Sequence, residues 1–242
     1  MEEVVQTLVE EGALLGDRGS YRLAQAPTTL QLPSTVQAVL AARIDRLAPD
    51  EKALLQQLSV IVREFPLSLV RQVITQPEDD LYRLLSALQR KEFLYEQPAF
   101  PEVEYLFKHA LTQEVAYGSV LIERRKALHE QTAQAIERLF HDRLEERYGE
   151  LAHHYSRSSN TQKAVDFLRL AGKQAAQRSA NAEAIRHFST ALELLKTLPY
   201  TSEHVQDELA LQIALGPAWG DENSGKGGAI LRADRADFCS GG

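Results

Sequence analysis

The chain has 242 residues, of which 44% are hydrophobic and 25% are charged, and its formal net charge at pH 7 is −7. This length is enough for one to three small domains, each with a hydrophobic core. The negative charge argues against a general affinity for nucleic-acid phosphates or anionic membranes, because an acidic surface repels both.

Membrane-spanning and disulfide-rich classes are excluded as well. No apolar run approaches the roughly 18 residues that a membrane-spanning helix needs. The first residues are acidic and amphipathic, which is not the pattern of a secretory signal. The single cysteine, Cys239, leaves no internal disulfide and no multi-cysteine metal site. We therefore expect a protein of the reducing cytoplasm.

The first elements along the chain are a short helix, a tight turn at residues 16–19 and a strand at residues 20–23. The helix has no upstream partner to pack on, so we expect the chain to begin within a domain. A second helix follows, with Ser34 or Thr35 as its N-cap. The apolar stripe of the first helix consists of Val4, Val5, Leu8 and Val9, and that of the second consists of Val36, Val39, Leu40, Ile44 and Leu47.

Three helices and a β-hairpin make up the middle of the chain. The first helix starts at Pro49, with carboxylates in its first turn, where the helix dipole favours them. The other two helices cover residues 67–74 and 78–90, and strands at residues 93–96 and 104–107 form the hairpin. Three helices followed by a hairpin indicate a winged-helix-like module.

A winged helix often reads DNA through its third helix. Here that helix opens with Glu78, Asp79 and Asp80, and three carboxylates near the entering end would repel phosphate. We therefore expect a module that faces protein rather than DNA. The cations that offset these carboxylates are Arg83, Arg90 and Lys91.

The most informative stretch is residues 104–131, in which a strand turns into a helix at His109. Apolar residues recur from there at nearly helical spacing. The pattern carries a basic cluster, Arg124, Arg125 and Lys126, which is a solvated helix face or a contact with either phosphate or an acidic partner. We predict an interdomain contact. The apolar positions are Ala110, Leu111, Val115, Ala116, Val120, Leu121, Ala127 and Leu128.

A weak internal repeat follows in the helical second half. Corresponding positions of its two copies, such as Ala152 and Gly172, are 20 residues apart, compared with roughly 34 in a tetratricopeptide unit. Residues 161–179 are therefore expected to be one shared helix, followed by helices at residues 181–198 and 203–215. The first copy is Ala152, Tyr155, Ala164, Leu168 and Ala171, and the second is Gly172, Ala184, Phe188 and Ala191.

The sequence changes character after Gly216 and Pro217. Residues 219–242 are rich in Gly, Asp, Arg and Ser and have no periodicity, so we expect a tail without regular structure. Residues 220–227 nearly match a phosphate-binding loop, but Gly227 replaces the hydroxyl residue that would bind magnesium. No buried strand precedes the loop and its carboxylates would repel phosphate, so we interpret the match as accidental.

The histidines support one weak metal hypothesis. His153 and His154 are adjacent, and neighbours on a helix point about 100° apart, so the two cannot easily share a metal. Glu150 and His154 lie one turn apart, a spacing that suits a metal only with a third ligand. Because none is evident, we interpret these residues as helix surface. We expect no catalytic residue, no cofactor and no metal in the chain.

Four segments occur along the chain in this order: EEVVQTLVEEGALLGDRGSYRL, LPSTVQAVLAARIDRLAPDEKALLQ, YLFKHALTQEVAYGSVLIERRKALH and RSANAEAIRHFSTALELL. Together they resemble the region behind the ATPase core in STAND-class P-loop ATPases of bacterial signalling. In many of these proteins a class III adenylate/guanylate cyclase domain lies at the N-terminus and tetratricopeptide-like repeats lie at the C-terminus. The resemblance covers residues 2–215 and is specific through the combination of its motifs.

The resemblance implies a mostly α fold in four parts. Residues 1–47 are expected to be a remnant of the helical lid of the ATPase core, and residues 48–120 a winged-helix-like module with a small β-hairpin. Residues 121–215 are expected to form an antiparallel tetratricopeptide-like array, and residues 216–242 a disordered or frameshifted tail. The nucleotide-binding loop and the cyclase domain of such proteins lie upstream, so ATP and magnesium are expected in the parent protein.

Two details follow from the resemblance. Arg43 or Arg46 could approach the nucleotide, although surface salt bridges to Asp45 or Asp50 fit the sequence better. Family members continue past residue 218 with an amphipathic helix, and codons of residues 219–231 read one nucleotide out of register permit a helix-like string. We therefore expect a frameshift in the source gene, which resequencing across the Pro217 codon tests.

The leading functional hypothesis is a non-catalytic regulatory and protein-interaction fragment of a multidomain signalling ATPase, linked to a class III nucleotide cyclase. Its partners would be the upstream ATPase core and cyclase domain, and a protein or small-molecule effector on the repeats. A membrane partner is not expected, and nucleic acid is disfavoured. The alternatives are a DNA-binding transcription regulator of the ATPase-repeat type and an autonomous ATPase that uses residues 220–227.

Overall fold

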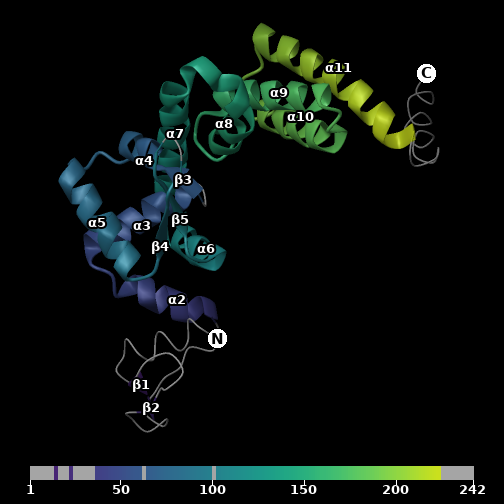
Figure 1. Cartoon of the computed structure of the whole chain (residues 1–242). Helices are drawn as coiled ribbons and strands as arrows, with labels where there is room; N and C mark the ends of the chain where they lie inside the picture. Colours follow the sequence, from purple (N-terminus) through teal and green to yellow (C-terminus); the bar gives the residue numbers. More distant parts are fainter. Residues whose placement is uncertain (1–13, 16–21, 24–35, 62–63, 100–101, 225–242) are drawn as a thin grey trace, which may run out of the picture. The chain divides into compact units, whose positions relative to one another are not determined.

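The structure is a computed structural model that describes residues 14–15, 22–23, 36–61, 64–99 and 102–224 (Figure 1). It is mostly helical with a small antiparallel sheet, so the predicted fold class is confirmed. The chain divides into two compact units, Met1–Leu128 and His129–Gly242, and each buries its own apolar side chains. No helix in the described part of the chain is both long and apolar enough to cross a membrane.

The first unit opens with a short antiparallel ladder between β1 (Leu14–Leu15) and β2 (Arg22–Leu23). β2 lies within the predicted strand. The predicted first helix, the turn after it and the N-cap of the second helix lie outside the described residues. α2 (Val36–Asp45) follows, and its apolar spacing predicts its buried face except at Val36, which is 39% exposed. The buried apolar residues of this face are Val39, Leu40 and Ile44.

Three helices of the first unit stand close to their predicted places. They are α3 (Pro49–Ile61), α4 (Leu67–Val73) and α5 (Glu78–Arg90). α3 packs against α5, and the leucines that recur at helical spacing point into the core between them. These leucines are Leu54, Leu55, Leu58, Leu81, Leu84, Leu85 and Leu88.

A three-stranded antiparallel sheet completes the winged-helix-like module, in the order β3 (Glu64–Pro66), β5 (Glu104–Phe107) and β4 (Leu94–Gln97). The hairpin of β4 and β5 confirms the prediction. β3 is absent from the prediction, because three residues that end in proline are too short to show a strand period. Phe65 of β3 is fully buried, and its ring centroid lies 6.2 Å from that of Phe107.

The helix predicted to continue past His109 is divided into α6 (Ala110–Gly118) and α7 (Ile122–Leu139). Ser119 occupies the break: its hydroxyl donates to the Ala116 carbonyl at 2.6 Å and accepts from Gln56 Nε2 at 2.9 Å. A serine that bonds to the backbone competes with the helix ladder, and Gly118 before it has low helix propensity. The helical spacing in the sequence continues through this break, so it gives no sign of the turn.

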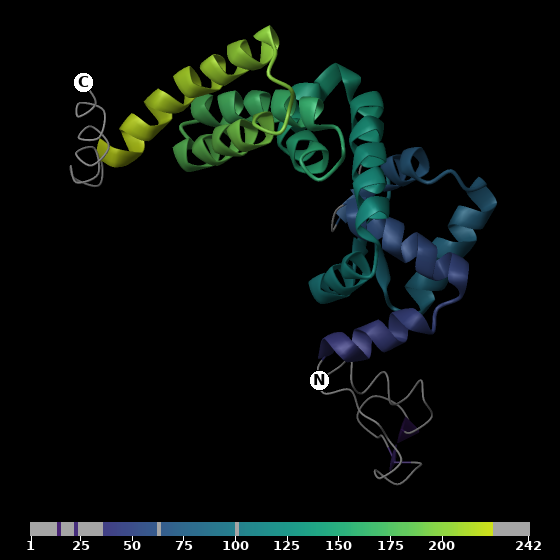
Figure 2. The ribbon, with the colours of Figure 1, turned by 180° about the vertical axis from the view of Figure 1, so that it is seen from behind.

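The second unit consists of helical segments, with α9 and α10 side by side and α11 packed against α10 (Figures 1 and 2). α9 also packs against α8, which fits the single shared helix that the repeat offset predicts. The segments are η2 (His141–Arg147), α8 (Tyr148–Tyr155), α9 (Thr161–Gln177), α10 (Asn181–Leu195) and α11 (Ser202–Ser224). Every position of the predicted repeat is buried: Ala152, Tyr155, Ala164, Leu168, Ala171, Gly172, Ala184, Phe188 and Ala191.

The last described helix is longer than predicted. The apolar pattern of the sequence predicts its end at residue 215, whereas α11 continues through Gly216 and Pro217 to Ser224. Glycine and proline lower helix stability without ending this helix. The first five residues of the near match to a phosphate-binding loop therefore have helical backbone, which a phosphate-cradling loop does not have. The remainder of that match, from residue 225, lies outside the described residues.

Candidate functional site

The predicted contact residues Arg124, Arg125 and Lys126 lie in the first turns of α7, each in a different environment. The Arg124 side chain is exposed. The Arg125 guanidinium lies over the Tyr117 ring, 4.6 Å from its centroid, which is a cation–π distance. Lys126 Nζ is 2.9 Å from Glu123 Oε1; the Glu123 side chain is largely exposed and that of Lys126 is about half-buried. The cluster is thus partly held by its own helix and by α6.

Two exposed apolar side chains precede these cations in the chain, separated from Arg124 by the exposed Glu123. Leu121 is 78% exposed and Ile122 is 65% exposed. Val120 beside them has the opposite orientation: it is 3% exposed and belongs to a buried cluster with Val60 and Leu128. The turn before α7 therefore directs one apolar residue inward and the next two outward. We call Leu121, Ile122, Arg124, Arg125 and Lys126 the junction surface.

The composition of the junction surface is suited to a protein contact. Fully burying an exposed leucine or isoleucine side chain is worth about 1.5 to 3 kcal/mol. Arginine is enriched at protein–protein interfaces together with large apolar residues. The cations are visible in the sequence, but the helical spacing wrongly places Leu121 in the buried stripe. The spacing does not show the break at Ser119, which turns Leu121 out of that stripe.

The candidate DNA-reading helix α5 presents carboxylates, not cations, at its first turn. Glu78, Asp79 and Asp80 are all exposed there. The Arg71 guanidinium forms an ion pair with Glu78, and Arg83 Nη2 lies 2.9 Å from Asp80 Oδ1. These two arginines are thus engaged by the same carboxylates that would repel a phosphate backbone.

Two lysines near the sheet are also paired. Lys91 Nζ lies 2.5 Å from Glu51 Oε2, and Lys108 Nζ lies 3.0 Å from Glu92 Oε2. Burial acts to raise the pKa of Glu51, but the hydrogen bond and charge of Lys91 outweigh it and hold this pKa below its usual value. Burial opposes the charge of Lys108 as well, yet its bonds to Glu92 and Tyr95 raise its pKa. Both lysines are therefore engaged in ion pairs within the first unit.

The structure corrects the prediction for Arg43. Its side chain was expected at the surface, but the residue is 4% exposed, and the guanidinium lies 5.0 Å from the centroid of the Phe93 ring. Arg43 Nη2 donates to the Lys91 carbonyl at 3.1 Å. Asp45, its predicted partner, instead accepts from Lys52 Nζ at 2.6 Å. A cation–π contact and a carbonyl acceptor allow this arginine to be buried.

An open groove of about 550 Å³ lies between α2 and α6. Its lining consists of Gln37, Ala38, Ala41, Glu114 and Val115. Because Glu114 is the one charged residue of these five, the lining supplies no acid–base pair of the kind that catalysis by proton transfer needs.

The histidine prediction is half correct. His153 is exposed, as predicted, and its Nδ1 lies 3.1 Å from Arg157 Nη1. His154 is a core residue instead, 1% exposed, with Nδ1 2.9 Å from Nδ1 of His129, which is 2% exposed. The two rings form a buried hydrogen bond in which one nitrogen donates and the other accepts. His129 lies on α7, so sequence spacing gives no sign of this pair.

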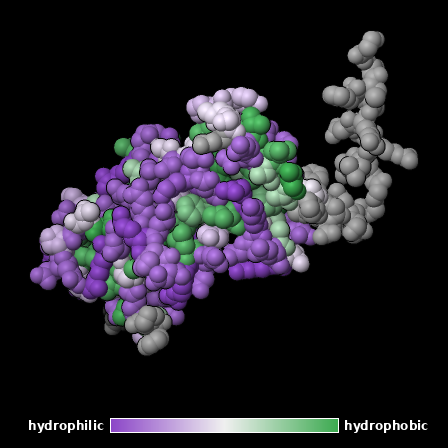
Figure 3. All heavy atoms as spheres, turned by 90° about the horizontal axis from the view of Figure 1, so that it is seen from above, coloured by the Kyte–Doolittle hydropathy of each residue, from purple (hydrophilic) through white to green (hydrophobic). Residues whose placement is uncertain are grey.

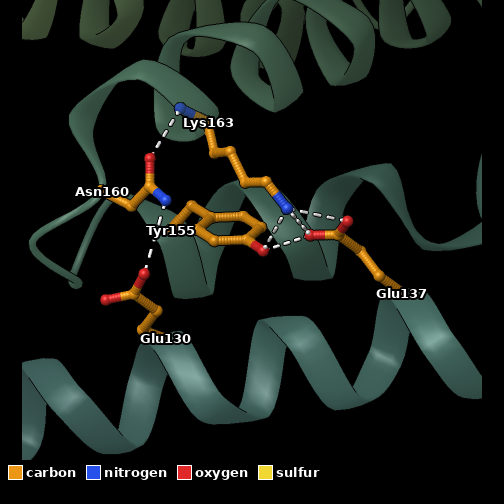
Figure 4. A network of polar contacts seen from close by, with 5 residues as sticks. All are labelled: Glu130, Glu137, Tyr155, Asn160 and Lys163. Carbon is orange, nitrogen blue, oxygen red and sulfur yellow. Dashed lines mark hydrogen bonds and ion pairs between the residues drawn. The ribbon is translucent and has the colours of Figure 1, made fainter.

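A polar network joins α7, α8 and α9 in the second unit (Figure 4). The Tyr155 hydroxyl donates to Glu137 Oε1, and Lys163 Nζ donates to both carboxylate oxygens at 2.7 and 2.9 Å. Asn160 caps α9 by accepting from the Lys163 amide at 3.2 Å and donates to Glu130 Oε1 at 3.4 Å. Burial first, and then the Glu137 carboxylate, raises the pKa of Tyr155 to about 12. The phenol therefore stays protonated, which suits a structural role.

Within the described ranges, no three His, Cys, Asp or Glu side chains gather as a metal-binding group. Over 113 residues, 47% of this chain, the sequence is 32% identical to an uncharacterized protein of Rhizobium meliloti (strain 1021). The matched segment spans 11% of that much longer protein. No protein-family model matches the chain.

Proposed function

We propose that this chain is a non-catalytic regulatory and protein-interaction part of a larger cytoplasmic signalling ATPase, linked to a class III nucleotide cyclase. The observation that carries the proposal is the junction surface, where Leu121 and Ile122 are 78% and 65% exposed beside three cations. An exposed apolar pair with arginine next to it is the composition of a protein contact. The partner for this surface is the ATPase core of the parent protein, which would also hold ATP and magnesium.

The regulatory mechanism is a shift between two packed arrangements. In one arrangement the junction surface contacts the ATPase core, and in the other it does not. An effector bound to the helices of the second unit shifts this equilibrium only if it has different affinities for the two states. The cyclase domain is the output in this scheme.

The charge on α5 supports protein contact over DNA reading. Its first turn carries exposed Glu78, Asp79 and Asp80, and Arg71 and Arg83 are paired with two of them. A helix that enters the major groove needs free cations for the phosphates on either side. We therefore expect no mobility shift of duplex DNA at moderate salt. A shift that α5 substitutions abolish would favour a transcription regulator instead.

The test is a binding measurement between this chain and the ATPase core of its parent protein. Wild-type chain should bind, and the Leu121→Ser/Ile122→Ser double variant should bind about tenfold or more weakly, since two apolar side chains no longer contribute. Arg124→Glu should lower the affinity and make it depend less on salt concentration, because the variant loses a cation that attracts the partner. Tyr200→Ser, at a residue that is 79% exposed elsewhere, is the matched control and should bind like wild type. Equal binding by all four proteins, or by none, contradicts the proposal.

A further inference from the structure

The exposure of the junction surface depends on the short turn between α6 and α7. Leu121 and Ile122 are exposed, whereas Val120 immediately before them is buried. Hydrophilic residues cover most of the face of the molecule that is seen from above, with hydrophobic patches between them (Figure 3). Two adjacent apolar side chains that are both exposed therefore need a local cause, and the turn supplies it.

Two residues of α3 fix this turn. Gln56 Nε2 donates to the Ser119 hydroxyl at 2.9 Å, and that hydroxyl donates in turn to the Ala116 carbonyl at 2.6 Å. Val60 lies one helical turn after Gln56, and so on the same side of α3, and it belongs to one buried cluster with Val120. The turn is thus tied to α3 by a hydrogen bond and by apolar packing.

The backbone of the turn departs from an α-helix at Leu121. In a continuous helix the Leu121 amide would donate to the Tyr117 carbonyl, four residues before it. Here the Val120 amide donates to that carbonyl instead, at 3.2 Å. The Leu121 amide has no backbone acceptor within the part of the chain that the structure describes. Hydrogen exchange at this one amide therefore distinguishes the bent backbone from a straight helix.

The apolar spacing of the sequence favours the straight helix. Apolar residues recur at nearly helical spacing from Ala110 to Leu128, and this spacing predicts Leu121 in the buried stripe. The contacts with α3 favour the bent backbone, in which Leu121 is exposed. A segment whose local preference disagrees with its tertiary contacts can adopt two packed arrangements that differ little in free energy.

We propose that Gln56 is a positioning residue that sets the exposure of the junction surface. While Gln56 bonds to Ser119, the backbone stays bent and Leu121 is exposed. When this bond is lost, the segment from α6 to α7 straightens and Leu121 turns inward. This role of Gln56 rests on the proposed function, in which the junction surface contacts the ATPase core. Any event that moves α3 would then change that contact from outside the junction surface.

The experiment measures amide exchange at Leu121 by nuclear magnetic resonance in the whole chain. The amide should exchange rapidly in wild type and about twofold or more slowly in Gln56→Ala, where about half of the molecules or more would be straight. The Cα chemical shifts of Val120 and Leu121 should move toward helical values in this variant. Ser119→Ala removes the acceptor of the same hydrogen bond and should act in the same direction, whereas Ser119→Thr keeps a hydroxyl and should resemble wild type.

The matched control is Gln113→Ala. Gln113 Nε2 donates to the Ser59 carbonyl at 3.2 Å, so it joins the same two helices away from the turn. Its loss should leave the exchange rate of the Leu121 amide unchanged. Equal or faster exchange in Gln56→Ala overturns the proposal, and so does an equal slowing in Gln113→Ala, because any bond between α3 and α6 would then have the same effect.

Binding to the ATPase core separates this proposal from the proposed function. A wild-type chain that does not bind the core contradicts the proposed function, whereas the exchange measurement needs no core and still decides the role of Gln56. If wild type binds, Gln56→Ala should bind about twofold or more weakly, since only the bent form exposes Leu121. Wild-type affinity in a variant whose Leu121 amide exchanges slowly would show that the bend does not control the junction surface.

Discussion

At the scale of single residues, the packing of α9 against α10 depends on one missing side chain. A Cβ atom added at Gly172 of α9 would lie 2.5 Å from the Phe188 ring of α10. Real Cβ atoms do not approach an aromatic carbon this closely, so the ring or the helix would have to move. Phe188 is fully buried and has little room to do so.

We therefore expect Gly172→Ala to destabilise the second unit by about 1 to 3 kcal/mol, the usual range for overpacking a core. Urea unfolding monitored by circular dichroism measures this loss. Gly149→Ala is the matched control, because no atom lies within 4 Å of the Cβ that it would add to α8. The free energy of unfolding of that variant should be unchanged or higher by up to about 1 kcal/mol, because alanine has a better helix propensity than glycine. If both variants were equally stable, the close approach would be refuted.

A second residue-scale prediction concerns acid stability. His187 is 4% exposed, and burial, then the charge of Arg186, lowers its pKa, with Glu183 acting in the opposite direction. A histidine whose folded pKa lies below its unfolded value of about 6.5 binds more protons when unfolded. Its neutral form thus favours the folded state above pH 6.5, and this contribution is lost as pH falls from there through the folded pKa.

We expect the urea midpoint of wild type to fall between pH 7.5 and 5.5, and to fall less in His187→Gln. His141, whose side chain is 72% exposed, provides the control: His141→Gln should keep the wild-type slope. If the urea midpoint of His187→Gln fell with pH as steeply as that of wild type, His187 would have the same pKa in the folded and unfolded chain.

At the scale of elements, the start of α4 depends on a residue far along the chain. Glu102 Oε2 accepts from the Ser68 amide at 2.8 Å, and Glu102 Oε1 accepts from the Ser68 hydroxyl at 2.5 Å. The N-cap residue Pro66 has no side chain that caps. One orphan amide of the first turn, that of Ser68, is thus satisfied by a carboxylate that precedes β5, while the Leu67 amide donates to the Val103 carbonyl at 3.1 Å.

We expect Glu102→Ala to destabilise the first unit by about 1 kcal/mol, the usual effect of losing a helix cap. Thermal unfolding of the variant measures this, with the native-state amide exchange of α4 as the local readout. Glu102→Gln should retain part of the effect because its oxygen still accepts from the Ser68 amide. Glu64→Ala, at an exposed position on β3, serves as control, and an equal loss there would argue against a specific cap.

The elements also show which features a sequence can predict. Helical spacing of leucines predicts α3 and α5 because their burial is periodic and local. It does not predict β3, because β3 is held by its pairing with the distant strand β5, in which Glu64 and Leu106 pair 42 residues apart. Buried polar partners such as His129 and His154 are missed for the same reason. The cations of the junction surface are visible in the sequence, whereas the exposure of Leu121 depends on a break set by Ser119.

At the scale of the whole molecule, the junction surface has a charge opposite to that of the chain. It combines the exposed apolar side chains of Leu121 and Ile122 with three cations, whereas the chain has a net charge of −7 at pH 7. A partner with exposed carboxylates is therefore attracted to the junction surface, while the chain as a whole repels it.

The continuity of α7 has a practical consequence for dividing the protein into recombinant fragments. The division between the units falls after Leu128, inside a helix that runs unbroken from Ile122 to Leu139. A fragment that ends at this division would cut α7 in two, while one that starts after the turn at Ser119 would remove Leu128 from its contact with Val60. Neither boundary leaves both halves intact. An expression strategy for either unit therefore has to carry all of α7, and two fragments that overlap along this helix are the pair to prepare.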